Sequence, residues 1–164
     1  MKEPFISLAM LTRESLVPMI NVFKSFIDKA KNIENVECIV AFDADDCLTM
    51  SQFQSHQQRA WPDIQFEYVI LEDRLPWEEL YKAWNKLYKR CKGEWIIFCS
   101  DDCSNLTENW DEIIERKYKG KFAHVKTVVH PTEMDHPDPI APITCKKFLD
   151  IIGYAGPNTH FDKW

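Results

Sequence analysis

Apolar and polar positions along the chain predict an alternation of strands and helices. Short apolar runs indicate buried strands, whereas apolar residues that recur every three or four positions indicate helices with one buried face. The expected strands cover residues 5–11, 36–42, 64–71, 95–99 and 122–129. The expected helices cover residues 16–31, 49–60, 76–91, 107–118 and 146–152. Strands that alternate with helices favour right-handed crossovers and a mainly parallel sheet, so the expected fold class is α/β, a three-layer α/β/α sandwich.

Length and composition fit a single domain. A chain of 164 residues with 45% hydrophobic content is sufficient for one globular core, which we expect to span residues 1–164. No apolar run approaches the roughly 18 residues of a membrane span, and no signal peptide is recognisable, so a cytoplasmic location is expected. Residues 130–142 contain four prolines and are predicted to form a loop whose length favours a functional role.

Charge and cysteine content narrow the functional classes. The formal net charge of -6 opposes tight binding to a polyanion, because nucleic-acid affinity depends largely on lysine and arginine. The six cysteines form no C-x-x-C pair, and several fall inside predicted strands or helices. Reduced cysteines in the core are therefore favoured over a zinc ribbon or a disulfide framework.

Acidic side chains follow the predicted strands at the point where each strand ends. For one acid alone, helix capping is the simpler explanation. Here several strand ends are involved, and in open α/β sheets the ligand crevice lies outside the carboxyl ends of the strands. The residues expected at this edge are Thr12 and Arg13, Asp43 with Asp45 and Asp46, Asp73 with Arg74, and Asp101 with Asp102.

Clustered carboxylates repel one another unless a cation is present, so these acids favour a divalent ion with oxygen ligands, Mg²⁺ or Mn²⁺. The chain has only four glycines and neither a P-loop nor a dinucleotide fingerprint. The diphosphate of a bound nucleotide would therefore be neutralised by a metal on Asp102 and by Arg13. Asp43 or Asp45 would accept hydrogen bonds from the base or the ribose.

Several segments resemble the glycosyltransferases of the GT-A fold, family-two type. Residues 6–13 (ISLAMLTR) are similar to the family's first strand with its nucleotide-contacting Thr-Arg, and residues 37–43 (ECIVAFD) to its second strand with a base-binding acid. Residues 92–102 (KGEWIIFCSDD) resemble the strand that leads into the DxD-type metal motif, and residues 109–111 (NWD) follow in the familiar position. Asn85 lies on a helix where the family often has an asparagine.

The resemblance implies a metal-dependent, inverting transfer of a sugar from a nucleotide diphosphate sugar to an acceptor hydroxyl. Residues 153–157 (GYAGP) look like the loop that precedes an acceptor-side acid, and Asp162 matches that acid best. The motif reads Asp-Asp-Cys and so lacks the second acid of a full D-x-D. The implied roles are catalytic base for Asp162, metal ligand for Asp102, and nucleotide contacts for Thr12, Arg13, Asp43, Asp45 and Asp101.

Two other functions stay open at this point. The chain could be a catalytically inactive GT-A-like module that binds nucleotide sugars or another protein, because fold does not imply function. A nucleotidyltransferase shares a similar sheet but normally needs a glycine-rich loop after the first strand, and residues 11–16 contain no glycine. The acceptor is open among a glycan, a small molecule and a modified nucleic acid, as is the oligomeric state. We expect either a minimal enzyme of viral or phage type or a chain truncated at its C-terminal end.

Overall fold

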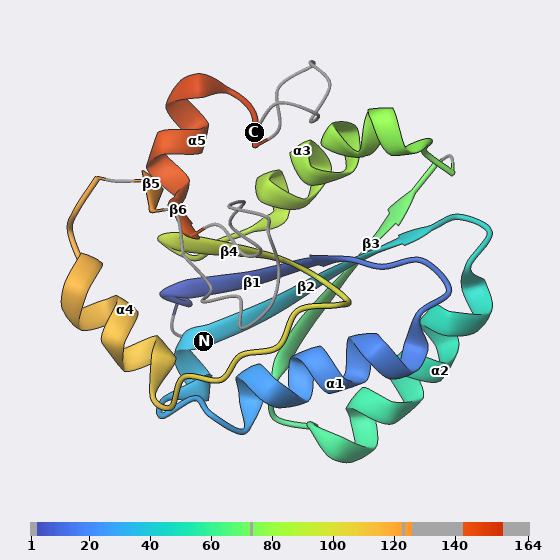
Figure 1. The fold of residues 1–164 in the computed structure, drawn as a ribbon, viewed down its shortest axis with the longest axis horizontal. Coiled ribbons are helices and arrows are strands. Elements are labelled where there is room, and N and C mark those ends of the chain that lie inside the picture. Colours follow the sequence, from blue (N-terminus) through green and yellow to red (C-terminus); the bar gives the residue numbers. More distant parts are fainter. Residues whose placement is uncertain (1–2, 73, 123, 126–142, 156–164) are drawn as a thin grey trace, which may run out of the picture.

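The computed structural model describes residues 3–72, 74–122, 124–125 and 143–155 (Figure 1). The strands are β1 (Ile6–Leu11), β2 (Val36–Asp43), β3 (Gln65–Leu71), β4 (Trp95–Ser100), β5 (His124–Val125) and β6 (Ile143–Cys145). The α-helices are α1 (Leu16–Ile27), α2 (Cys47–Ala60), α3 (Leu80–Arg90), α4 (Trp110–Tyr118) and α5 (Lys146–Ile152). Two 3-10 helices, η1 (Ile33–Asn35) and η2 (Trp77–Glu79), precede β2 and α3.

The strands of the described residues form one six-stranded sheet with the order β3-β2-β1-β4-β6-β5. The first four strands in this order run parallel, whereas β6 is antiparallel to β4 and β5 is antiparallel to β6. The prediction of a mainly parallel sheet is confirmed. Strand β6 was not predicted, because its three residues follow a proline-rich stretch and are too few to show a periodicity.

Helices cover both faces of the sheet, which confirms the three-layer α/β/α sandwich. Figure 1 shows α1 and α2 on one face and α3 and α5 on the other. Successive strand residues point to opposite faces and so enter two separate cores. The core on the α1, α2 and α4 face includes Leu8, Met10, Phe23, Phe42, Phe53, Trp95 and Trp110. The core on the α3 and α5 face includes Ala9, Ile39, Leu87, Ile96 and Leu149.

Helix α4 begins three residues later than its periodicity predicts. The side-chain oxygen of Asn105 accepts a hydrogen bond from the Thr107 backbone N–H at 3.1 Å, and its amide nitrogen donates to the Thr107 carbonyl at 3.2 Å. Asn109 then adopts a left-handed conformation with φ of 55°. These local bonds hold residues 105–109 outside the helix, as is common for asparagine near helix starts.

Some predictions fall outside the described residues: Asp73, Asp162 and the loop at residues 130–142. The single domain over residues 1–164 also stays a prediction. In the part of the chain that the structure describes, no helix has both the length and the apolar character needed to cross a bilayer.

Candidate functional site

The carboxyl ends of β1, β2 and β4 lie side by side and bring several of the predicted residues together. Leu11 pairs with Ala41 of β2 and with Ser100 of β4, so the residues that follow these positions share one edge of the sheet. The Thr12 hydroxyl donates to Asp101 Oδ2 at 3.3 Å, which joins the end of β1 to the turn after β4. Thr12 itself is buried, whereas Asp101 is partly exposed.

Asp43 is a buried carboxylate of this edge, with an exposed fraction of 4%. Its Oδ2 accepts a hydrogen bond from Arg13 Nε, and Arg13 Nη2 donates to the Leu75 carbonyl at 2.8 Å. Asp43 Oδ1 is buried and has no hydrogen-bond partner among the described residues. A buried acceptor without a partner is costly, so Oδ1 is well suited to receive an N–H or O–H donor from a ligand.

A second group of charged side chains lies at the exposed surface of this edge. Arg74 Nη1 donates to Glu14 Oε1 at 2.9 Å and to Asp45 Oδ2 at 3.3 Å. Hydrogen bonds to Glu14 first, and to Asp45 second, raise the pKa of Arg74. Asp45 Oδ2 is therefore already engaged by a cation.

Asp46 differs from its neighbours because it supports the backbone. Its Oδ2 accepts a hydrogen bond from the Glu14 N–H at 2.8 Å, and the side chain is buried. Glu14 has a positive φ of 54°, a conformation that costs a non-glycine residue free energy. The bond from Asp46 thus stabilises the turn that presents Thr12 and Arg13.

In the Asp-Asp-Cys segment, the aspartates lie at the carboxyl edge of the sheet and the cysteine lies in the core. Asp102 is exposed, and its Oδ1 accepts a hydrogen bond from the Ser100 hydroxyl. Cys103 is buried in the core on the α1 face, and its Sγ lies 3.7 Å from Asp102 Oδ1. Burial raises the pKa of the Cys103 thiol, so the group stays protonated at neutral pH. The third position of the motif therefore packs the core instead of adding a carboxylate.

The acids of this edge fit a divalent ion only together with a ligand. Among the described residues, no group of three His, Cys, Asp or Glu side chains is arranged to hold a metal ion. Mg²⁺ and related ions commonly bind to one or two carboxylates, with the remaining positions taken by phosphate oxygens and water. Asp102 and its neighbour Asp101 meet that smaller requirement. The donor set therefore fits an ion that arrives with a diphosphate.

Two contacts of α3 on its face of the sheet were not predicted. Asn85 Oδ1 accepts a hydrogen bond from the Ala155 N–H at 2.6 Å, which fixes the segment after α5 against α3. On the same helix, the Trp84 ring meets the Phe98 ring edge-on at 5.3 Å. The resemblance gave the position of Asn85 but no contact, and the Leu75 carbonyl that binds Arg13 has no signal in the sequence at all.

The segment at residues 109–111 has a structural role. Trp110 Nε1 donates to the Phe26 carbonyl at 2.8 Å, and the Asp111 carboxylate accepts the backbone N–H groups of Lys31 and Asn32 at 2.8 and 2.7 Å. These bonds attach the start of α4 to the end of α1 and to the loop that follows α1. The residues therefore anchor the loop that contains the acid pair.

Comparison with known proteins identifies the family of this chain. Residues 12–148 match the family described as glycosyl transferase family 2, and the chain therefore belongs to that family. No curated protein sequence is a significant match.

Solved structures share the fold at low sequence identity. The mannosyltransferase PcManGT from Pyrobaculum calidifontis, in complex with GDP-Man and Mn²⁺, aligns with a TM-score of 0.77 at 13% identity, over 96% of this chain and 48% of that one. S. aureus TarS 1-349 in complex with UDP aligns with a TM-score of 0.67 at 14% identity, over 93% and 50%. The glycosyltransferase GlyE of Streptococcus pneumoniae TIGR4 aligns with a TM-score of 0.59 at 8% identity, over 93% and 36%. The chain thus spans half or less of the length of these structures.

Proposed function

We propose that this chain transfers a sugar from a nucleotide diphosphate sugar to an acceptor hydroxyl. The observation that carries the proposal is Asp43 Oδ1, which is buried, lacks a hydrogen-bond partner among the described residues and lies next to Arg13 at the carboxyl edge of the sheet. An acceptor atom of this kind suits the N–H of a nucleobase. Family membership and the nucleotide ligands of PcManGT and TarS support the same reading.

The proposed nucleotide contacts follow from the positions of the side chains. Asp43 accepts a hydrogen bond from the base, and Arg13, which holds Asp43 in place, adds positive charge at the same point. Thr12 and Asp101, already joined to each other, contact the ribose. Asp45 takes part once Arg74 has released it.

The metal role falls to Asp102, with Asp101 in support. A Mn²⁺ or Mg²⁺ ion held there would supply positive charge that stabilises the leaving diphosphate. The neighbour PcManGT contains Mn²⁺, which agrees with this choice of ion. Ser100 orients the Asp102 carboxylate through its hydroxyl, so the side chain is held before any ligand arrives.

Asp162 is the proposed base, on the strength of its position after the residues 153–157 segment. As the acceptor hydroxyl attacks the anomeric carbon, Asp162 removes its proton. Attack from the side opposite the diphosphate gives inversion through an oxocarbenium-like transition state.

The proposal also covers the cellular compartment, the domain organisation and the acceptor. All six cysteines are free, which suits the reducing cytoplasm. We propose a single domain over residues 1–164, with the acceptor left open among a glycan, a small molecule and a modified nucleic acid.

The test is binding of nucleotide sugars by isothermal titration calorimetry. UDP, GDP and CDP sugars are titrated with and without Mn²⁺ into the wild type, Asp43→Ala, Asp102→Ala and the control Asp63→Ala, which removes an exposed acid elsewhere. We expect one nucleotide to bind, Asp43→Ala to weaken it under both conditions, and Asp102→Ala to remove only the gain from Mn²⁺. Absence of binding by every nucleotide would contradict the proposal.

A catalytically inactive nucleotide-sugar-binding module is the second candidate, and Cys103 is the observation that favours it. A buried cysteine replaces the second acid of the metal motif, so one carboxylate fewer is present to hold the ion. The measurement that separates the two candidates is release of free nucleotide from the bound donor. Binding with no release for any acceptor supports the module, and release that Asp162→Asn abolishes supports the transferase.

A further inference from the structure

The outer surface of α5 and the segment after α4 together expose lysines beside large apolar side chains. Phe122 is 55% exposed and Ile151 is 67% exposed. Lys121 and Lys147 are also exposed. We call these four residues, Lys121, Phe122, Lys147 and Ile151, the basic-apolar patch.

The four residues form one surface although they come from two segments. The Phe122 ring meets the Phe148 ring of α5 at 5.7 Å between centroids, which joins residue 122 to the side of that helix. Lys147 and Ile151 are four positions apart on α5 and therefore lie next to each other on its exposed side. Leu149 points the opposite way, into the core on the α3 face.

The lysines of the patch are available to a partner. Neighbouring lysines are neutralised within the fold: Lys119 pairs with Glu115, and Lys146 pairs with Asp150. Among the described residues, no carboxylate lies within salt-bridge distance of Lys121 or Lys147. This local positive charge occurs in a chain whose formal net charge is -6.

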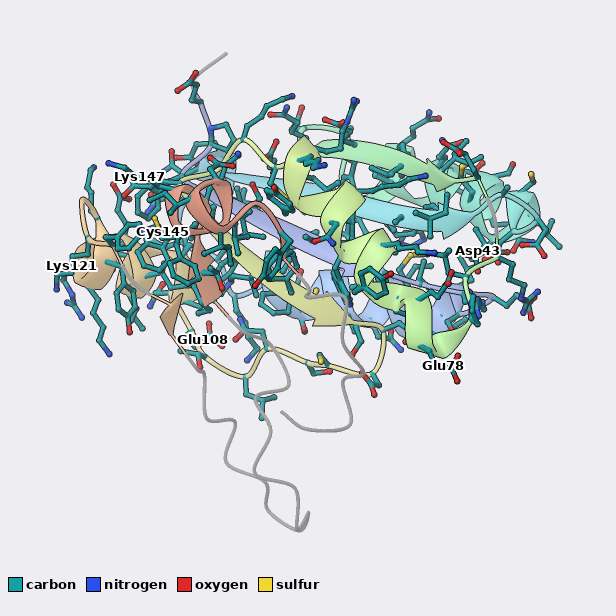
Figure 2. The ribbon with its side chains drawn as sticks, turned by 90° about the horizontal axis from the view of Figure 1, so that it is seen from above. Asp43, Glu78, Glu108, Lys121, Cys145 and Lys147 are labelled. Atoms are coloured by element: carbon teal, nitrogen blue, oxygen red, sulfur yellow. The ribbon has the colours of Figure 1, made fainter. Side chains whose placement is uncertain are left out.

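The basic-apolar patch is remote from the candidate site. Figure 2 shows Lys121 and Lys147 at one end of the molecule and Asp43 at the other. The patch is thus not a further part of the nucleotide site, and a partner bound there leaves the carboxyl edge of the sheet open.

We propose that the basic-apolar patch docks the protein on an anionic lipid bilayer. Exposed apolar side chains enter the boundary between headgroups and acyl chains, while lysines beside them extend their charged ends to lipid phosphates. A nucleic acid would match the lysines but offers no apolar layer for Ile151, and the patch contains no arginine for bidentate phosphate contacts. A lipid surface of negative charge offers a partner to both kinds of side chain.

Vesicle co-sedimentation tests this proposal without any need for enzymatic activity. The 164-residue chain is mixed with vesicles of phosphatidylcholine alone and with vesicles that also contain phosphatidylglycerol. We expect binding only to the anionic vesicles, weakened by salt. Each lysine near such a surface strengthens binding by about fivefold, so Lys121→Glu with Lys147→Glu should weaken it by about 30-fold or more.

A second pair of variants and a charge-matched control keep the test decisive. Phe122→Ser with Ile151→Ser removes the apolar insertion and should weaken binding by about tenfold. The control, Arg59→Glu with Lys89→Glu, makes the same charge change at exposed positions on α2 and α3 and should weaken binding far less. Circular dichroism of each variant confirms that it is folded.

Three outcomes would overturn the proposal. The first is equal binding to neutral and anionic vesicles, or to neither. The second is loss of binding in the control pair to the same extent as in the patch variants. The third is evidence that the patch binds a different partner. Such evidence would be duplex DNA that binds as tightly as the vesicles and equally well to the serine variants, or a dimer that the serine variants dissociate. Asp43→Ala should bind vesicles like the wild type, so this result is independent of the nucleotide proposal.

Discussion

Strand β2 has a buried carboxylate at each end of the same face, and the two are held in different ways. At the amino end, Glu37 Oε1 accepts hydrogen bonds from Ser7 Oγ at 2.6 Å, the Lys92 N–H at 2.5 Å and the Gly93 N–H at 3.2 Å. At the carboxyl end, Asp43 Oδ2 has one side-chain partner, Arg13, whose side chain is 35% exposed.

Each carboxylate also has one buried oxygen without a partner among the described residues, Glu37 Oε2 and Asp43 Oδ1. An orphaned oxygen alone therefore does not mark a ligand site. The difference lies in the donors: those of Glu37 belong to neighbouring backbone and strand residues, whereas Asp43 depends on a side chain that solvent reaches. Together with the usual position of ligands at the carboxyl edge, this favours a structural role for Glu37 and supports the proposed binding role of Asp43.

Replacement of Glu37 by alanine should have the largest effect on stability. The Ser7 hydroxyl and the Lys92 N–H would lose their acceptor, whereas the Gly93 N–H would keep Ser7 Oγ at 2.9 Å, and unpaired buried donors cost about 1 to 3 kcal/mol each. We expect the free energy of unfolding in urea to fall by about 4 kcal/mol. A loss smaller than that of Asp43→Ala would reverse the roles assigned to the two carboxylates.

Replacement of Gly93 by alanine should have the second-largest effect on stability. A Cβ at residue 93 would lie 2.5 Å from the Ser7 nitrogen and 2.7 Å from the Ile6 carbonyl carbon, so strand backbone must move. We expect a loss of about 3 kcal/mol in the urea denaturation experiment. Gly120→Ala is the control: it meets no atom within 4 Å and should cost only about 1 kcal/mol for its positive φ. Equal losses for the two variants would show that the close contact is unimportant.

Replacement of Asp43 by alanine should change binding more than folding. We expect nucleotide affinity to drop by about 30-fold, or roughly 2 kcal/mol, because the base loses its acceptor. Calorimetric titration measures the affinity, and urea denaturation of the same samples measures stability. Unchanged affinity combined with a large loss of stability would place Asp43 in the same structural class as Glu37.

Replacement of Arg74 by alanine should have the smallest effect. Its bonds to Glu14 and Asp45 are exposed, and exposed ion pairs contribute little to folding. The urea midpoint should stay within experimental error of the wild type. A midpoint shift as large as that of Gly120→Ala would show that the ion pairs of Arg74 contribute to the stability of the fold.

Much of the fold could be predicted because it depends on local patterns. The apolar spacing of α3 and the uninterrupted apolar run of β4 are readable from neighbouring residues alone. Strand β6 was missed because three residues show no period, and it exists only through its pairing with β4.

For the candidate site, the sequence predicted the edge of the sheet but not the role of each acidic residue there. Asp43, Asp45 and Asp46 look alike in the sequence, yet one is buried at the site, one is paired with Arg74 at the surface, and one supports the turn at Glu14. The direction of each of these side chains depends on a hydrogen bond to a residue 29 to 32 positions away in the sequence. The role of Glu37 likewise depends on contacts with residues 30 and 56 positions away, which no local pattern reveals.

The anchor formed by Trp110 and Asp111 has a practical consequence for protein engineering. Strand β4 fixes the acid pair, and the bonds to Phe26, Lys31 and Asn32 fix the point where the chain re-enters the fold. Leu106, between these fixed points, is 81% exposed. A peptide tag or a grafted recognition loop inserted there would break the Asn105–Thr107 bonds but leave β4 and the α4 anchor intact, which makes this a suitable place to extend the molecule beside its candidate site.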